Sequence, residues 1–245
     1  MGMYPDEVLL TADQDGQLPL HMAILNQHRN LELFDLLLHS SGKHVNFMLA
    51  TADRNGRLPV HCALERRQRR GGVSSDVLRM LMGPSPYHAL AVADNEGRRP
   101  LQTALLHRAD LEVIQLLLDR SPSDSLSSTD NKGRIPLSCC VEASVSIEVV
   151  QLLINLTPLH VICTPDQYGR LLLHGIQPST PAEVVILLAE RAPELLLSPD
   201  TGGRLAIHCA NQSTASLPMV QALWTPAPSH CWLPTGTADY LCTCC

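Results

Sequence analysis

Aromatic residues are scarce in this chain, and apolar runs long enough to cross a membrane are missing. Only 3% of the 245 residues are aromatic, whereas 45% are hydrophobic. Any core must therefore consist mainly of Leu, Val, Ile and Ala, which suits packed helices better than a β-sandwich. No apolar stretch approaches the roughly 18 residues of a membrane-spanning helix, so we expect no membrane insertion.

A basic excess is also missing. The chain has 18 Lys and Arg against 24 Asp and Glu, which gives a net charge of −6 at pH 7. Proteins that bind nucleic acids need a surplus of positive charge to neutralise phosphates. The composition therefore argues against nucleic acid as a partner.

The first residues, MGMYPDEVLL, lack the basic and apolar segments of a secretory signal. Nine cysteines form an odd number without framework spacing, which favours free thiols and a cytoplasmic location. Asp6 stands where a myristoylation motif has Ser or Thr, so Gly2 is not expected to be acylated. The dense basic run of residues 66–70, from Arg66 to Arg70, leaves nuclear import open beside the simpler reading of a solvated loop.

Catalytic signatures are missing from the sequence. It contains no nucleophile elbow, phosphate-binding loop, dinucleotide fingerprint or His-Glu-x-x-His motif. We therefore expect no enzyme activity, no cofactor and no metal ion.

What the sequence does contain is one motif of about twelve residues, written six times. The copies begin near residues 13, 53, 94, 130, 166 and 200, and "DRNGRLPVHCAL" at 53–64 is a clear example. A period of this length is typical of a solenoid, in which units too small to bury their own apolar face stack on their neighbours.

The motif predicts a tight turn followed by a short helix. Asp opens the turn, and three residues later Gly adopts a backbone conformation that other residues reach only with strain. Proline then fits the first helical turn, where a missing amide costs little. The predicted buried anchors of these helices are Leu20, Val60, Leu101, Leu137, Leu173 and Ile207.

A longer apolar helix completes each unit, as in "DLEVIQLLL" at 110–118. Its apolar positions cover most of the circumference, as expected for a helix with neighbours on both sides. Proline then ends it. The predicted N-caps are Asn30, Asp110, Ser146 and Thr180.

This order of turn, short helix, longer helix and loop resembles the ankyrin repeat, over about residues 5–226. The segments "GRLPVHCAL" and "GQLPLHMAI" carry the resemblance best. The Thr of the family's Thr-Pro-Leu-His motif is absent throughout. Repeats five and six lack the Pro, and repeats three and four lack the His. The resemblance implies an all-α, ankyrin-like helical repeat solenoid with short turn loops.

The repeat grammar divides the chain into three parts. Residues 1–12 look like the tail of a truncated preceding repeat, residues 13–228 form the array, and residues 229–245 are a Cys-rich tail outside the pattern. The first apolar face then lacks a preceding unit, so we expect a longer protein or a segment or partner that covers it. The tail is expected to be disordered, and a gene-model artefact stays open.

The histidine and cysteine positions of the motif could suggest a metal site, but a structural role is favoured. His21, His61, His174 and His208 would lie on helices roughly 8–10 Å apart, whereas zinc ligands lie roughly 2.0–2.1 Å from the metal. In ankyrin-like units this imidazole binds turn backbone and ties adjacent loops together. Cys62, Cys139 and Cys209 are expected to be small buried hydrophobes.

The resemblance implies a monomeric, non-catalytic scaffold that binds a protein on a concave surface of turns and first helices. The arginines either contact acidic groups of the partner or pair with aspartates of the turns. The candidate partner-binding residues are Asp15, Asn55, Glu96, Lys132 and Tyr168 at the turn tips, with Arg57, Arg98, Arg134, Arg170 and Arg204 beside the glycines.

Two alternative functions remain open. The chain could be the targeting or regulatory segment of a larger ankyrin-containing enzyme or channel. It could also be a lipid-anchored or metal-binding adaptor that uses the terminal cysteine cluster, Cys242, Cys244 and Cys245.

Overall fold

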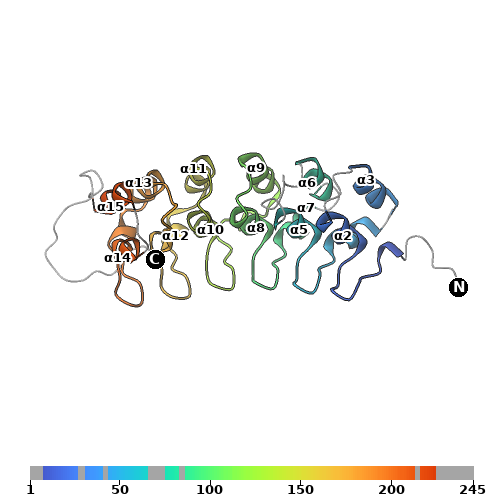
Figure 1. The fold of residues 1–245 in the computed structure, drawn as a ribbon, viewed down its shortest axis with the longest axis horizontal. Helices are drawn as coiled ribbons and strands as arrows, with labels where there is room; N and C mark the ends of the chain where they lie inside the picture. The colour runs from blue at the N-terminus through green and yellow to red at the C-terminus, as the bar shows by residue number, and fades with distance from the viewer. Residues whose placement is uncertain are drawn as a thin grey trace. The chain divides into compact units, whose positions relative to one another are not determined.

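The computed structural model describes residues 8–26, 31–40, 44–65, 75–82, 86–212 and 216–224 (Figure 1). Within these ranges the chain forms helices and turns, with no β-strand, which confirms the all-α prediction. The chain divides into two compact units, Met1–Lys132 and Gly133–Cys245, and each is a stack of helix pairs.

In the first unit, short helices that follow the turns pack side by side, and α5 contacts both α2 and α8. Figure 1 shows the longer helices in a second layer, where α3 contacts α6. The short helices are α2 (Pro19–Leu25), α5 (Pro59–Glu65) and α8 (Pro100–Leu106), and the longer ones are α3 (Leu31–Ser40), α6 (Ser75–Met82) and α9 (Leu111–Arg120).

The second unit repeats this arrangement. In one layer η3 contacts both α10 and α14, and in the other α13 contacts both α11 and α15. The first layer contains α10 (Pro136–Ala143), the 3₁₀ helix η3 (Leu172–Gly175) and α14 (Ala206–Gln212), and the second contains α11 (Ile147–Leu156), α13 (Ala182–Arg191) and α15 (Leu217–Trp224).

The local predictions for the turns are confirmed. The glycine of each of the six motifs has a positive φ, between 68° and 76°, which a residue with a Cβ reaches only with strain. Four of the first helices begin at the proline of the motif, where the missing amide has no helical partner to lose. These prolines are Pro19, Pro59, Pro100 and Pro136.

The predicted anchors lie in the core, with one exception. Leu20, Val60, Leu137 and Leu173 are at most 4% exposed. Ile207 in α14 is only half-buried, which corrects the prediction for the sixth repeat. No following turn or helix pair is described beyond α15 to cover it.

Two further details of the helices differ from the sequence prediction. Thr180 is not the N-cap of α13, because Pro181 occupies that position. Instead the Thr180 hydroxyl accepts a hydrogen bond from the Gln177 amide and donates to the carbonyl oxygen of Val141. In repeat five only the single turn of η3 forms, and Gly175, a poor helix former, is its last residue.

Several of the prolines that end the longer helices also begin a third, short helix that the sequence did not predict. A third, very short helix precedes several turns, and proline stands at its first position or its N-cap in three of these. These helices are α4 (Val45–Ala50), α7 (Pro86–Ala91), α12 (Leu159–Ile162, with Pro158 as N-cap) and η4 (Pro193–Leu196). Proline suits these positions because its fixed φ matches the helix.

Several predictions concern residues outside the described ranges. They include the N-cap Asn30, the basic run of residues 66–70, residues 1–7, and the tail of residues 229–245 with its cysteines. The division of the chain near residues 12 and 228 therefore stays a prediction.

Candidate functional site

Each turn is built around the carboxylate of its first aspartate. In the second motif, Asp53 Oδ1 accepts hydrogen bonds from the backbone amides of Asn55 and Arg57, both at 2.9 Å. Asp94, Asp166 and Asp200 accept the equivalent pairs of amides. A carboxylate that satisfies two amides fixes the turn's backbone, which explains why Asp opens the motif.

The other carboxylate oxygen holds the arginine beside the glycine. Arg57 donates from Nε and Nη2 to Asp53 Oδ2, at 2.9 and 2.7 Å. Arg98, Arg170 and Arg204 form the same ion pair with Asp94, Asp166 and Asp200, each at 2.8 Å from Nη2. The arginine stripe of the sequence therefore lies against the turns' own carboxylates, as one of the two sequence hypotheses proposed.

These contacts shift the ionisation of both partners. Burial alone would raise the pKa of Asp53, but the hydrogen bonds from the Arg57 side chain and amide hold it below its usual value. The hydrogen bond to Asp53 also stabilises the charged form of the Arg57 guanidinium, and its pKa rises although burial opposes this. At Asp200 the Arg204 amide and then its guanidinium lower the carboxyl pKa to about 2. Asp53 and Asp200 are therefore ionised throughout the neutral range.

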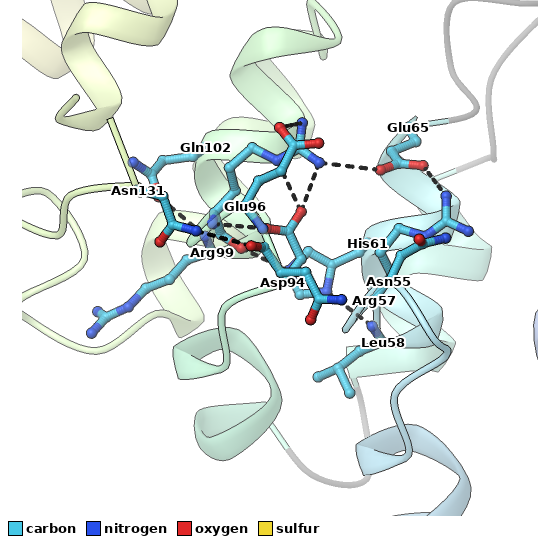
Figure 2. A network of polar contacts seen from close by, with 12 residues as sticks. Asn55, Arg57, Leu58, His61, Glu65, Asp94, Glu96, Arg99, Gln102 and Asn131 are labelled. Atoms are coloured by element: carbon cyan, nitrogen blue, oxygen red, sulfur yellow. Dashed lines mark hydrogen bonds and ion pairs between the residues drawn. The ribbon is translucent and has the colours of Figure 1, made fainter. Parts of the chain in front are cut away.

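A glutamate joins two neighbouring turns in the first unit. Figure 2 shows Glu65, at the end of α5, between two arginines. Its carboxylate lies 2.7 Å from Arg57 Nη1 and 3.8 Å from Arg98 Nη2. In the second unit, Glu142 pairs with Arg134 in the same way. Neither glutamate was predicted from the sequence, although each stands eight residues after its arginine.

The histidines tie each first helix to the next turn. His61 Nδ1 accepts a hydrogen bond from the Leu58 amide at 3.1 Å, and its Nε2 lies 3.2 Å from the Arg98 carbonyl oxygen. His21 and His174 make the same pair of contacts. Burial lowers the pKa of His61 to about 4, so the ring is neutral. The structural role predicted for these three imidazoles is confirmed.

Gln102 occupies the histidine register in the third motif and reproduces one of the two contacts, the bond from the amide three residues before it, whereas its second bond has a different partner. Its Oε1 accepts a hydrogen bond from the Arg99 amide at 3.1 Å, and its Nε2 donates to the Ser128 carbonyl oxygen at 3.5 Å. Across the described residues, no three metal-binding side chains converge.

The tip residues are placed differently from the arginines. The side chains at the five predicted tips are all exposed, namely Asp15, Asn55, Glu96 and Lys132 in the first unit and Tyr168 in the second. In the first unit the following turn holds the backbone of two of these tips, because the Asn95 amide donates to the Asn55 carbonyl oxygen at 3.0 Å and the Asn131 amide donates to that of Glu96 at 2.9 Å. Side-chain amides of Asn95 and Asn131 add a second bond to the preceding turn.

The arginines divide into two groups by exposure. The side chains of Arg57 and Arg98 are only 18% and 14% exposed, whereas those of Arg170 and Arg204 are 34% and 49% exposed. Arg170 also lies over the Tyr168 ring, 5.1 Å from its centre, a distance at which cation and ring attract each other. The tip side chains, Arg170 and Arg204 are thus the accessible members of the predicted site, whereas Arg134, with a side chain 10% exposed, is as enclosed as Arg57 and Arg98.

The buried thiols do not form a reactive site. Cys62, Cys139 and Cys140 are buried and form no disulfide, and burial raises the pKa of the Cys62 thiol to about 12. Cys209 is half-buried, so the predicted hydrophobic role is confirmed for Cys62 and Cys139 and corrected for Cys209. Among the described helices, none combines the length and the apolar character that a membrane crossing requires.

Comparisons with known proteins point to one repeat type. The model of the ankyrin repeat matches residues 15–48. A search of curated proteins finds no match. The chain is similar to a solved structure, the ankyrin repeat domain of Bcl-3, described there as a unique member of the IkappaB protein family. That likeness has a TM-score of 0.64 and covers 88% of this chain and 85% of the other, at 24% sequence identity.

Proposed function

We propose that this chain, which has the fold of an ankyrin repeat array, is a non-catalytic scaffold that binds a partner protein through its turn tips and first helices. Ankyrin repeats generally serve as protein-interaction modules, and the catalytic motifs that would indicate another role are missing from the sequence. The contact residues we assign are the tips Asp15, Asn55, Glu96, Lys132 and Tyr168, together with Arg170 and Arg204.

One observation carries the proposal. Each tip exposes its side chain on a turn whose aspartate accepts the tip's own amide, and in the first unit amides of the following turn also hold the carbonyl oxygens of Asp15, Asn55 and Glu96. A binding surface that is ordered before the partner arrives loses little conformational freedom on binding. Exposed side chains on a rigid ladder are therefore suited to recognition.

The tips favour a polar partner surface. The first unit presents a carboxylate, an amide, a second carboxylate and an ammonium group, from Asp15, Asn55, Glu96 and Lys132. The second unit adds Tyr168, an amphipathic side chain of the kind enriched in interfaces, beside the partly exposed Arg170. Acidic groups of the partner fit Arg170 and Arg204, whose guanidinium groups retain exposed surface.

Affinity capture with the full chain tests this surface. The bait is compared with a triple variant, Asn55→Ala, Lys132→Glu and Tyr168→Ala, and bound proteins are identified by mass spectrometry. Because the three side chains are exposed, the variant should keep the circular dichroism and melting temperature of the parent. We expect it to lose the partners that the parent recovers.

A matched control separates the tips from surface charge in general. Glu183→Lys alters an exposed residue in the first turn of α13, away from the tips, and should leave capture unchanged. Retention of every partner by the folded triple variant would show that the binding surface lies elsewhere.

A further inference from the structure

The last turn of the array has an open edge. His208 Nδ1 accepts a bond from the Leu205 amide, like the other histidines, but its Nε2 meets no carbonyl group among the described residues and the ring is exposed. The neighbouring Gly203 would have nothing within 4 Å of an added Cβ, whereas Gly16, Gly56 and Gly169 each lie against the following turn.

The first turn has the complementary edge. In the next two motifs, the residue after the aspartate donates its amide to the preceding tip: Arg54 to Asp15 O and Asn95 to Asn55 O, both at 3.0 Å. The equivalent amide, that of Gln14, donates to no group in the described part of the chain. The Gln17 carbonyl oxygen stands at the register that receives a histidine Nε2 from the preceding unit.

The last helix pair also leaves apolar positions uncovered. Trp224 at the end of α15 is 77% exposed, whereas Leu38 at the same register of α3 is 8% exposed. Val220 is half-buried, and its equivalent Phe34 is 2% exposed. These positions are buried in the first repeat and uncovered in the last, so they face the following unit.

The first helix pair shows the opposite pattern. Leu33 and Leu37 of α3 are half-buried, whereas their equivalents in α15, Met219 and Leu223, are 0% and 8% exposed. Met22 of α2 is 37% exposed, and its equivalent Cys62 is fully buried. These positions therefore face the preceding unit. The two ends of the array present the two halves of the contact that the repeats make inside each unit.

We propose that these two end faces bind each other in different copies of the chain, so that copies associate head to tail. In this contact His208 Nε2 donates to the Gln17 carbonyl oxygen, the Gln14 amide donates to the Gly202 carbonyl oxygen, and Trp224 and Val220 pack on Leu33 and Leu37. A second copy fits because its first turn offers the donor and the acceptor that the last turn lacks. This is the alternative to the monomer expected from the sequence, and it is independent of the proposed function because it does not use the tip side chains.

The contact joins two different faces, so it can be tested by mixing one variant that is blocked at the first face with another that is blocked at the last face. One variant blocks the first face: Gln14→Pro removes the amide donor at a turn position that proline tolerates, and Met22→Glu adds a charge. The other, Trp224→Glu, blocks the last face. Sedimentation equilibrium of the full parent chain should show mass rising with concentration, and each variant should associate roughly tenfold or more weakly.

A one-to-one mixture of the two variants should form a dimer that does not grow, because each supplies the face that the other lacks. Leu156→Glu, at an exposed position of α11 away from both ends, is the matched control and should associate like the parent. Gln14→Asn should strengthen association, since Asn95 and Asn131 at this register donate a side-chain bond at 2.9 Å to the preceding turn.

Three outcomes would overturn the proposal. The first is a parent chain that is monomeric at every concentration. The second is association of the single variants as strong as that of the parent, and the third is a mixture of the two variants that forms no dimer. If the parent chain is monomeric, the fluorescence of Trp224, measured in a Trp232→Phe variant, shows whether the last face is covered. A shielded indole would mean that the chain covers its own last face, and an exposed one would leave that face for a different protein.

Discussion

Nε2 of His61 lies 3.2 Å from the backbone carbonyl oxygen of Arg98, one repeat further along the chain. Nδ1 of the same ring accepts a hydrogen bond from the Leu58 amide. One nitrogen donates and the other accepts, so only the neutral imidazole can make both bonds. Protonation would turn the acceptor into a donor that faces another donor.

This arrangement predicts that stability falls in mild acid. The pKa of His61 is about 4 in the folded chain against 6.5 for a free histidine, so the unfolded chain binds the proton first as the pH falls. The contribution is complete above pH 6.5 and disappears as the pH falls through 4. It amounts to about 3 kcal/mol between pH 7 and pH 4 for this one group.

Urea unfolding at several pH values measures the effect. His61→Gln is the matched comparison, because Gln102 fills the same register, accepts the equivalent bond from the amide three residues before it and does not titrate. The variant's free energy of unfolding should depend less steeply on pH in this range. Equal slopes in parent and variant would contradict the assignment.

Glu65→Gln should lower the free energy of unfolding by about 1 kcal/mol, because the carboxylate is only 20% exposed and contacts two arginines. The loss should shrink at high salt, which screens the charges. Glu112→Gln provides the control. The Glu112 side chain is 62% exposed and that of its partner Arg79 is 51% exposed, so this ion pair should contribute less than about 0.5 kcal/mol. If the Glu65 variant were as stable as the control, the ion pairs of Glu65 with Arg57 and Arg98 would not contribute to stability.

Gly97→Ala and Gly203→Ala form a matched pair. Both glycines have φ above 70°, so alanine costs about 1 kcal/mol of backbone strain at either position. At Gly97 an added Cβ would also lie 2.6 Å from the backbone nitrogen of Asn131, whereas at Gly203 it meets nothing within 4 Å. Thermal unfolding should therefore show the larger loss for Gly97→Ala. Equal losses would mean that successive turns are not in close contact.

The Cys62 thiol should resist alkylation in the folded chain. It is buried, and its pKa of about 12 leaves almost no thiolate at neutral pH. Iodoacetamide labelling followed by peptide mass spectrometry should find Cys62 modified only after denaturant is added, with the half-buried Cys163 as an internal comparison. Rapid labelling of Cys62 in the native chain would contradict its placement in the core.

Residues that act within one turn were predictable, and residues that act between turns were not. Gly56 and Pro59 follow from backbone rules that need only a few neighbouring residues. Glu65 was missed because its second arginine stands 33 positions away, and no local rule places the two side chains together. The half-burial of Ile207 was missed for a related reason: burial depends on packing between repeats, which the neighbouring residues in the sequence do not decide.

The sequence by itself determined the repeating unit: its turn, its glycine conformation, its helices and the histidine bond to the turn. These features depend on residues a few positions apart and recur along the chain, the glycine in all six motifs and the histidine in four, so each copy reinforces the assignment. The tertiary structure alone decided which charges meet, which arginines stay accessible and which apolar positions remain open at Met22 and Trp224. Those properties arise from the packing of one repeat on the next, over distances in the chain that local propensities do not reach.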